Sequence, residues 1–269
     1  MGARGLDDAA RSAHSRYAPE HRALGIVAVA IVLLFLAEFI VRGYVLTGPG
    51  IWWWRFAVPI VSAVIGMAAT LGLIATRGST PPESPVIPSL RRTWLSFNSR
   101  PSLIASAIAV LALVGTTVFA GLASAPNGDG QYVWLAIPIP NEADIDPIRL
   151  PFYGWTYGVP VLASLAVLLL IAWAALDRNA ARPYLRPETV MAERTARRET
   201  ARGTVLLVTA AALLSLAGAW RLIASAGSGQ YLIVMGQNDN APYDAAWRYA
   251  ELAVAAGWAA PLVEIAALT

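Results

Sequence analysis

The chain alternates between long apolar runs and shorter polar connectors over its whole length. Six runs have the length of bilayer-crossing helices, at about residues 24–41, 56–76, 102–124, 157–176, 204–225 and 249–269. A transmembrane helix needs roughly 20 mostly apolar residues to cross the hydrocarbon core of a membrane. The pattern therefore predicts an all-α fold, a polytopic membrane helical bundle of six transmembrane helices.

A short aromatic motif recurs before the second, fourth and sixth runs. It reads WRFAVP at 54–59, WTYGVP at 155–160 and WRY at 247–249, and each copy follows a Gly-x-Gly. Gly and Pro break helices, while Trp prefers the headgroup level of a membrane. The shared order predicts three tandem hairpins, 24–76, 102–176 and 204–269, related by an axis along the membrane normal. The alternative is that turns and interfaces simply reuse these residue types, without common descent.

The tryptophans at these corners are interpreted as membrane-interface anchors. They are Trp52, Trp53, Trp54, Trp155 and Trp247. Their rings are half apolar and half polar, which suits the boundary between lipid and water. A stacking site for a sugar or a base is the alternative interpretation of three consecutive Trp at a turn.

The distribution of arginine predicts the orientation of the chain. The N-terminal tail 1–23 and the connectors 77–101 and 177–203 hold four, four and seven Arg, whereas the opposite loops hold one or two each. The positive-inside rule then predicts a cytoplasmic N-terminus, and after six spans a cytoplasmic end at Thr269. Within the last connector, Pro187–Arg202 begins with Pro and alternates Glu with Arg, which predicts a solvated or membrane-surface helix.

Composition supports the membrane class and excludes several kinds of site. The chain is 57% hydrophobic and 14% charged, while soluble domains carry about a quarter charged residues. It has no Cys, so disulfides and thiolate sites are excluded. His14 and His21 are seven residues apart and do not share a helix face as an i,i+4 pair does. We therefore expect no cofactor, no metal and no nucleic acid, and the lipid bilayer as the main partner.

Charged residues inside the apolar runs are the first candidates for function, because charge within a membrane is costly. Glu38 and Arg42 are four residues apart at the outer end of the first run, and Arg221 holds the position matching Arg42 in the fifth. One hypothesis is that these residues bind an anionic solute or a lipid headgroup through planar guanidinium groups. The alternative is that the arginines extend to the interface and remain hydrated.

Glu264 is a separate candidate, for ion coupling. Superposition of the three predicted hairpins puts it at the depth of Leu71 and Ala172, inside the apolar run. A carboxyl at that depth is protonated, paired or in contact with a polar cavity. Coupling to a proton or a cation requires such a group.

The polar outer loops and the known catalytic motifs add no assigned site. Carboxylates at Glu142, Asp144, Asp146, Asp239 and Asp244 are of the type that binds Ca²⁺, but neither loop has the spacing of an EF-hand. No phosphate-binding loop, His-Glu-x-x-His or Gly-x-Ser-x-Gly is present. The sequence therefore assigns no catalytic residue.

The leading hypothesis is a non-enzymatic structural or accessory subunit of a bacterial inner-membrane assembly, with another membrane protein as its partner. It follows from the sparse charge inside the apolar runs and the substantial loops on both faces. The alternative is a small secondary transporter for an anionic or proton-coupled solute that uses Arg42, Arg221 and Glu264. A membrane enzyme that acts on lipid through outer-loop carboxylates ranks third.

Overall fold

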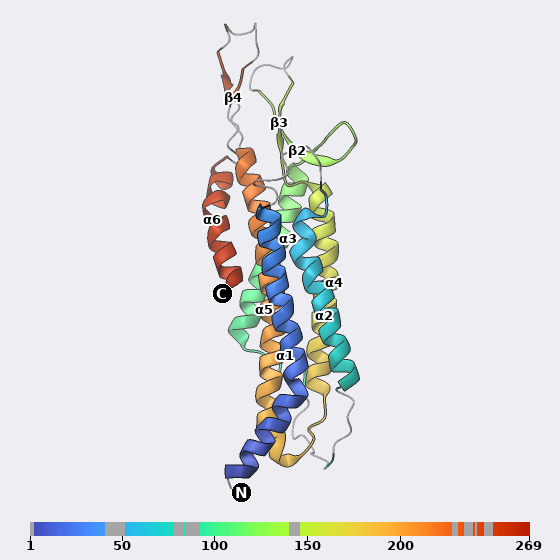
Figure 1. Cartoon of the computed structure of the whole chain (residues 1–269). Coiled ribbons are helices and arrows are strands. Elements are labelled where there is room, and N and C mark those ends of the chain that lie inside the picture. Colours follow the sequence, from blue (N-terminus) through green and yellow to red (C-terminus); the bar gives the residue numbers. More distant parts are fainter. Residues whose placement is uncertain are drawn as a thin grey trace. The chain divides into compact units, whose positions relative to one another are not determined.

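The structure is a computed structural model of the chain. It describes residues 3–40, 52–77, 83, 92–139, 146–227, 231–233, 239, 241–244 and 250–269, with the backbone only for 3–14, 39, 77, 231, 232, 243 and 244. Six α-helices lie in these ranges (Figure 1): α1 Ala3–Ile40, α2 Val58–Arg77, α3 Arg100–Ala123, α4 Trp155–Ala181, α5 Val190–Gly227 and α6 Ala250–Leu268. Short 3-10 turns, η2 Arg55–Ala57 and η3 Pro187–Thr189, precede α2 and α5. Each of the six helices is long and apolar enough to cross a membrane. This confirms the predicted all-α, multi-pass membrane fold, while the tandem hairpin repeat stays a prediction.

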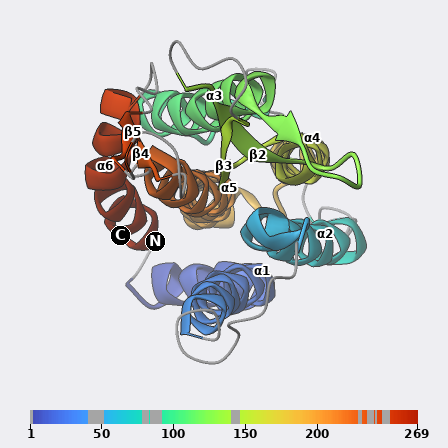
Figure 2. The same ribbon diagram turned by 90° about the horizontal axis from the view of Figure 1, so that it is seen from above.

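Small antiparallel sheets occupy two of the connections between helices. Strands β1 Ala125–Pro126, β2 Tyr132–Ile137 and β3 Ile148–Pro151 form one sheet in that order, and β4 Tyr231–Leu232 pairs with β5 Tyr243–Asp244 in another. Figure 2 shows β2 and β3 beside the ends of α3 and α4, to which the sheet is connected. In β2 every second residue is buried, at Val133, Leu135 and Ile137, as the two-residue period of a strand requires.

The chain forms two compact units, which we describe separately. The first unit contains Met1–Thr47, Pro59–Ala109 and Ser164–Ala211. The second unit contains Gly48–Val58, Val110–Ala163 and Ala212–Thr269.

In the first unit, glycines let α1 approach both α2 and α5. A Cβ added to Gly66 of α2 would lie 2.1 Å from Val27, and one added to Gly203 of α5 would lie 3.0 Å from Leu24. Small residues allow such close packing of helices, since no side chain separates the backbones. Helix α1 therefore contacts two helices through its apolar part.

Helices α1 and α5 are both 38 residues long and continue polar segments into apolar runs without a break. The predicted surface helix Pro187–Arg202 is helical from Pro187 onward, but it is the first part of a continuous helix and one of its faces is buried. The reason is that α5 contains no Pro, and its first glycine, Gly203, lies within the helix. The N-terminal tail likewise belongs to α1, although Pro19 stands inside that helix.

In the second unit, an aromatic cluster joins two copies of the motif. The ring of Phe56 makes edge-to-face contacts with Tyr153 at 5.1 Å and with Tyr157 at 5.3 Å between centroids. Phe56 and Tyr157 hold equivalent positions in the first two copies of the motif. A Cβ on Gly218 of α5 would lie 3.1 Å from the Phe56 ring, so this helix packs there as well. The third position of the motif therefore contributes to packing.

The buried phenol of Tyr153 predicts a loss of stability at alkaline pH. Burial raises the pKa of Tyr153 to about 12, while its hydrogen bond with Thr117 acts in the opposite direction. The folded state holds the phenol proton more tightly than the unfolded state does. The protonated phenol therefore contributes fully to the free energy of unfolding below pH ~10, and about 2–3 kcal/mol of that free energy is lost as the pH rises from ~10 to ~12. The difference in tyrosinate absorbance between the wild type and the Tyr153→Phe variant should titrate near pH 12. A difference that titrates near the ordinary tyrosine value would contradict the buried position.

The turn at Gly154, directly before α4, predicts a strong effect of a single methyl group. A Cβ at this position would lie 2.1 Å from the carbonyl oxygen of Tyr132 and 2.6 Å from Cβ of Ser124. The first of these is a backbone atom of β2, so it cannot rotate away. We expect Gly154→Ala to destabilise the protein by about 1–3 kcal/mol, measured by thermal unfolding in detergent. Gly128→Ala is the control, since nothing lies within 4 Å of its added Cβ, and equal melting temperatures for both variants would refute the packing.

Candidate functional site

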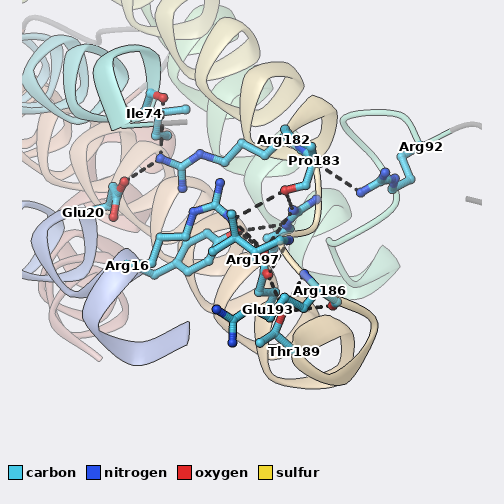
Figure 3. A network of polar contacts seen from close by, with 12 residues as sticks. Arg16, Glu20, Ile74, Arg92, Arg182, Pro183, Arg186, Thr189, Glu193 and Arg197 are labelled. Atoms are coloured by element: carbon cyan, nitrogen blue, oxygen red, sulfur yellow. Dashed lines mark hydrogen bonds and ion pairs between the residues drawn. The ribbon is translucent and has the colours of Figure 1, made fainter. Parts of the chain in front are cut away.

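Charged side chains are buried together in the first unit, where polar parts of α1 and α5 meet the segment that follows α4. Figure 3 shows this group, which we call the arginine–glutamate cluster, formed by Arg16, Glu20, Arg182, Glu193 and Arg197. Four of these residues are at most 3% exposed, and the side chain of Arg16 is 9% exposed. Charged residues are almost never fully buried unless they are paired, so the cluster is an unusual feature of this fold.

Glu193 is the centre of the cluster. It lies on α5 one turn before Arg197, so the two side chains share a helix face. Its two carboxylate oxygens accept five hydrogen bonds, from Arg16 Nη1 at 3.0 Å, Tyr17 OH at 3.3 Å, Leu185 N at 3.0 Å, Thr189 Oγ1 at 2.8 Å and Arg197 Nη2 at 3.4 Å. One carboxylate thus connects α1, the segment before η3, η3 and α5.

A second buried ion pair joins α1 to the end of α4. Nη2 of Arg182 donates to Oε1 of Glu20 at 2.6 Å and lies 3.5 Å from the carbonyl oxygen of Ile74 in α2. Tyr17 lies between the two ion pairs, because its ring is 5.0 Å from the Arg182 guanidinium and its hydroxyl accepts from Arg197 Nε at 3.0 Å. The two pairs therefore form one connected network.

Tyr184 connects the network to Arg92 in the segment before α3. Its ring lies between the guanidinium groups of Arg197 and Arg92, at 4.2 Å and 4.5 Å from the ring centroid. Arg92 also donates to the carbonyl oxygen of Arg182 at 3.2 Å. Cation–π contacts of this kind strengthen when they are desolvated, so the described part of the connector is held against the cluster.

The two residues predicted separately inside the fifth and sixth runs meet in the second unit. Arg221 of α5 forms a two-point ion pair with Glu264 of α6, with Nε–Oε1 at 2.6 Å and Nη2–Oε2 at 2.5 Å. The side chains are 44% and 15% exposed. The superposed hairpins had put the two residues at different depths. That inference is wrong, because a carboxylate in direct contact with Arg221 must lie level with it along α5.

The predicted pair of Glu38 and Arg42 stays a prediction. Glu38 is half-buried in α1, and Arg42 lies outside the described residues. The candidate binding site that combines Arg42, Arg221 and Glu38 is therefore untested.

The tryptophan anchors have two different environments. Trp52, Trp53 and Trp54 are exposed at the start of the segment that leads to α2. Trp155 is half-buried at the start of α4, and a Cβ on Gly121 of α3 would lie 2.5 Å from its ring. Trp155 therefore packs between helices, while Trp247 lies outside the described residues.

No group of three or more His, Cys, Asp or Glu that can hold a metal ion is found in the described ranges. Asp146 and Asp239 are exposed there, whereas Glu142 and Asp144 are outside those ranges. His21, which was assigned no role, lies beside the cluster, with Nε2 3.0 Å from Thr200 Oγ1 and 3.2 Å from the carbonyl oxygen of Ala196. It links α1 to α5.

Sequence reasoning missed the arginine–glutamate cluster. The arginines of 177–203 were interpreted as a signal of chain orientation, and that interpretation predicts a side of the membrane but no burial. The available signal was the i,i+4 spacing of Glu193 and Arg197 in the polar segment before the fifth apolar run.

Comparison of the chain with protein-family models, with curated proteins and with solved structures gives no match. The cluster offers guanidinium donors and two carboxylates, and the hydroxyl of Tyr17 contacts Glu193 and Arg197. Such groups hold helices together and bind anions.

Proposed function

We propose that this chain is a non-enzymatic structural or accessory subunit of a membrane assembly in a bacterial inner membrane. The observation that carries the proposal is the Arg221–Glu264 ion pair. A solute pathway needs charged groups that are available to the solute, whereas both carboxylate oxygens of Glu264 are engaged by Nε and Nη2 of Arg221. The pair therefore serves to fasten α6 to α5.

The burial of the charged side chains in the arginine–glutamate cluster supports the same function. Glu193 accepts five hydrogen bonds and Arg182 is paired with Glu20. Several bonds must break together if α1 is to move against α5, because the network connects both helices. A rigid scaffold suits a subunit that supports a partner more than a carrier that alternates between two shapes.

Helix α6 indicates where a partner is best sought. Only 11% of the residues in its apolar stretch are buried, which is the lowest share among the six spans in the described ranges. Val254, Trp258 and Leu262 follow one another at four-residue spacing and are exposed, and Trp258 is 79% exposed. Residues at this spacing share one helix face, which lipid or a neighbouring helix covers.

The test is site-specific photocrosslinking in native membranes. A photoreactive residue at Trp258 is expected to capture one membrane protein in a fixed ratio, and that protein should copurify with the unmodified chain. The same residue at Leu170 of α4, which is 65% exposed, is the control for random lipid-facing capture. Recovery of an isolated monomer that transports a solute in liposomes would overturn the proposal.

The second candidate function is a small secondary transporter for an anionic or proton-coupled solute. The observation in its favour is a carboxylate and a guanidinium within apolar runs, because an ion pair that opens can exchange its partner for a proton or an anion. In liposomes, a transporter would lose solute flux with Glu264→Gln and retain it with Glu251→Gln, an exposed carboxylate in the first turn of α6. Absence of flux with wild-type protein would exclude the solutes tested.

A further inference from the structure

The arginine–glutamate cluster contains donors that its own residues do not use. Within the cluster, the buried nitrogens without a hydrogen-bond partner among the described residues are Arg16 Nε and Nη2, Arg182 Nε and Nη1, and Arg197 Nη1. Buried polar groups are almost always paired, and a buried donor left unpaired costs about 1–3 kcal/mol, more for a charged group. Five such donors in one cluster therefore indicate a binding partner.

The three guanidinium groups that carry these donors surround the same residues. The guanidinium carbons of Arg16 and Arg182 lie 5.8 Å and 5.0 Å from the centre of the Tyr17 ring, and Arg197 donates to its hydroxyl at 3.0 Å. Arg16 and Arg197 also share two acceptors, the carbonyl oxygen of Pro183 and Oε2 of Glu193. The unused donors thus belong to one site.

The charge of the cluster favours an anion. Three arginines face two glutamates, Glu20 and Glu193, so the cluster holds one excess positive charge. Arg92, which stacks on Tyr184 opposite Arg197, adds another at its edge. Buried like charges repel strongly because the local dielectric constant is low. A bound anion would remove this repulsion.

We propose that the arginine–glutamate cluster binds a phosphate-type oxyanion between α1, the segment after α4 and α5. The planar guanidinium fork matches phosphate oxygens in a two-point geometry. Arg16 offers such a pair of unused donors, Nε and Nη2, while Arg182 adds Nε and Nη1 as separate donors and Arg197 adds Nη1. Glu20 Oε2, which is also buried without a partner among the described residues, is suited to accept from a hydroxyl of the ligand. The phosphate belongs to a lipid headgroup or to a soluble phosphate compound, which share this chemistry.

The test uses the full-length protein in a neutral detergent and compares two probes. The first is inorganic phosphate against chloride at equal ionic strength, and the second is vesicles of neutral phospholipid with and without an anionic phospholipid. We expect one of them to raise the melting temperature of the wild type, and Arg16→Gln to weaken the apparent affinity at least tenfold. A response to phosphate identifies a soluble ligand, and a response to the anionic vesicles alone identifies a headgroup.

Two further variants separate binding from folding. Arg16→Lys keeps the charge and removes the fork, so it should fold and still bind several-fold more weakly than the wild type. Arg198→Gln removes an exposed arginine one residue from Arg197 and should respond as the wild type does. The proposal is wrong if neither probe stabilises the wild type more than its control, or if Arg16→Gln responds as Arg198→Gln does.

Discussion

Glu193→Gln is expected to lower the free energy of unfolding by about 3–5 kcal/mol, the range measured when one partner of a buried ion pair is removed. The amide preserves the shape of the side chain. It removes the negative charge that Arg16 and Arg197 share, and it turns an NH₂ donor toward groups that are themselves donors. The buried arginines then lack a counter-charge, since Glu20 is engaged by Arg182.

Thermal and denaturant unfolding in one detergent would measure this loss. Glu199→Gln is the matched control, because Glu199 lies on the same helix and its side chain is 62% exposed. Its Oε2 lies 3.7 Å from Nδ1 of His21. Exposed ion pairs contribute about 1 kcal/mol or less, so this variant should unfold close to the wild type. Similar unfolding of the two variants would show that Glu193 is solvated, contrary to its buried position.

Hydropathy alone was sufficient to predict the six helices, because the bilayer imposes both a length and an apolar composition on each span. The second run was predicted at 56–76 and the helix is Val58–Arg77, while the third was predicted at 102–124 and the helix is Arg100–Ala123. The apolar runs do not show where a helix begins in polar sequence. For that reason α1 and α5 extend well beyond their predicted spans.

The two long-range ion pairs of the arginine–glutamate cluster could not be predicted because each joins distant parts of the chain. Arg16 and Glu193 are 177 positions apart, and Glu20 and Arg182 are 162 apart. Neither pair has a local spacing that marks it. The concentration of arginine near apolar runs also has a sufficient explanation in membrane orientation, so composition gives no reason to expect burial.

The Arg221–Glu264 pair illustrates a different limit. Both residues were selected as charges within apolar runs, because charge inside a membrane is costly. Their partnership was missed because the superposed hairpins assumed that all three corners have the same depth. Gly257 of α6 packs closely on Ala224 of α5, since an added Cβ would lie 3.2 Å from Cβ of Ala224. Packing of small residues, which a motif alignment does not contain, therefore decides which charges meet.

Glu264→Leu is expected to destabilise the protein by about 1.5–3 kcal/mol, because it removes the carboxylate that accepts hydrogen bonds from Nε and Nη2 of Arg221, and hydrogen bonds to charged groups contribute this much. Arg221→Leu removes the same two hydrogen bonds from the other side and should lower the stability by a similar amount. The double variant should recover most of the loss, since two apolar residues of similar volume often replace an ion pair at little cost.

Unfolding of the two single variants and the double variant in one lipid or detergent environment gives the coupling energy directly. Glu251→Gln, in the first turn of the same helix and exposed, controls for loss of charge on α6. Additive effects of the two substitutions would show that the side chains do not interact. A double variant that regains stability and captures the same protein at position 258 as the wild type would show that the charges of the pair are dispensable once α6 is held against α5 by other means.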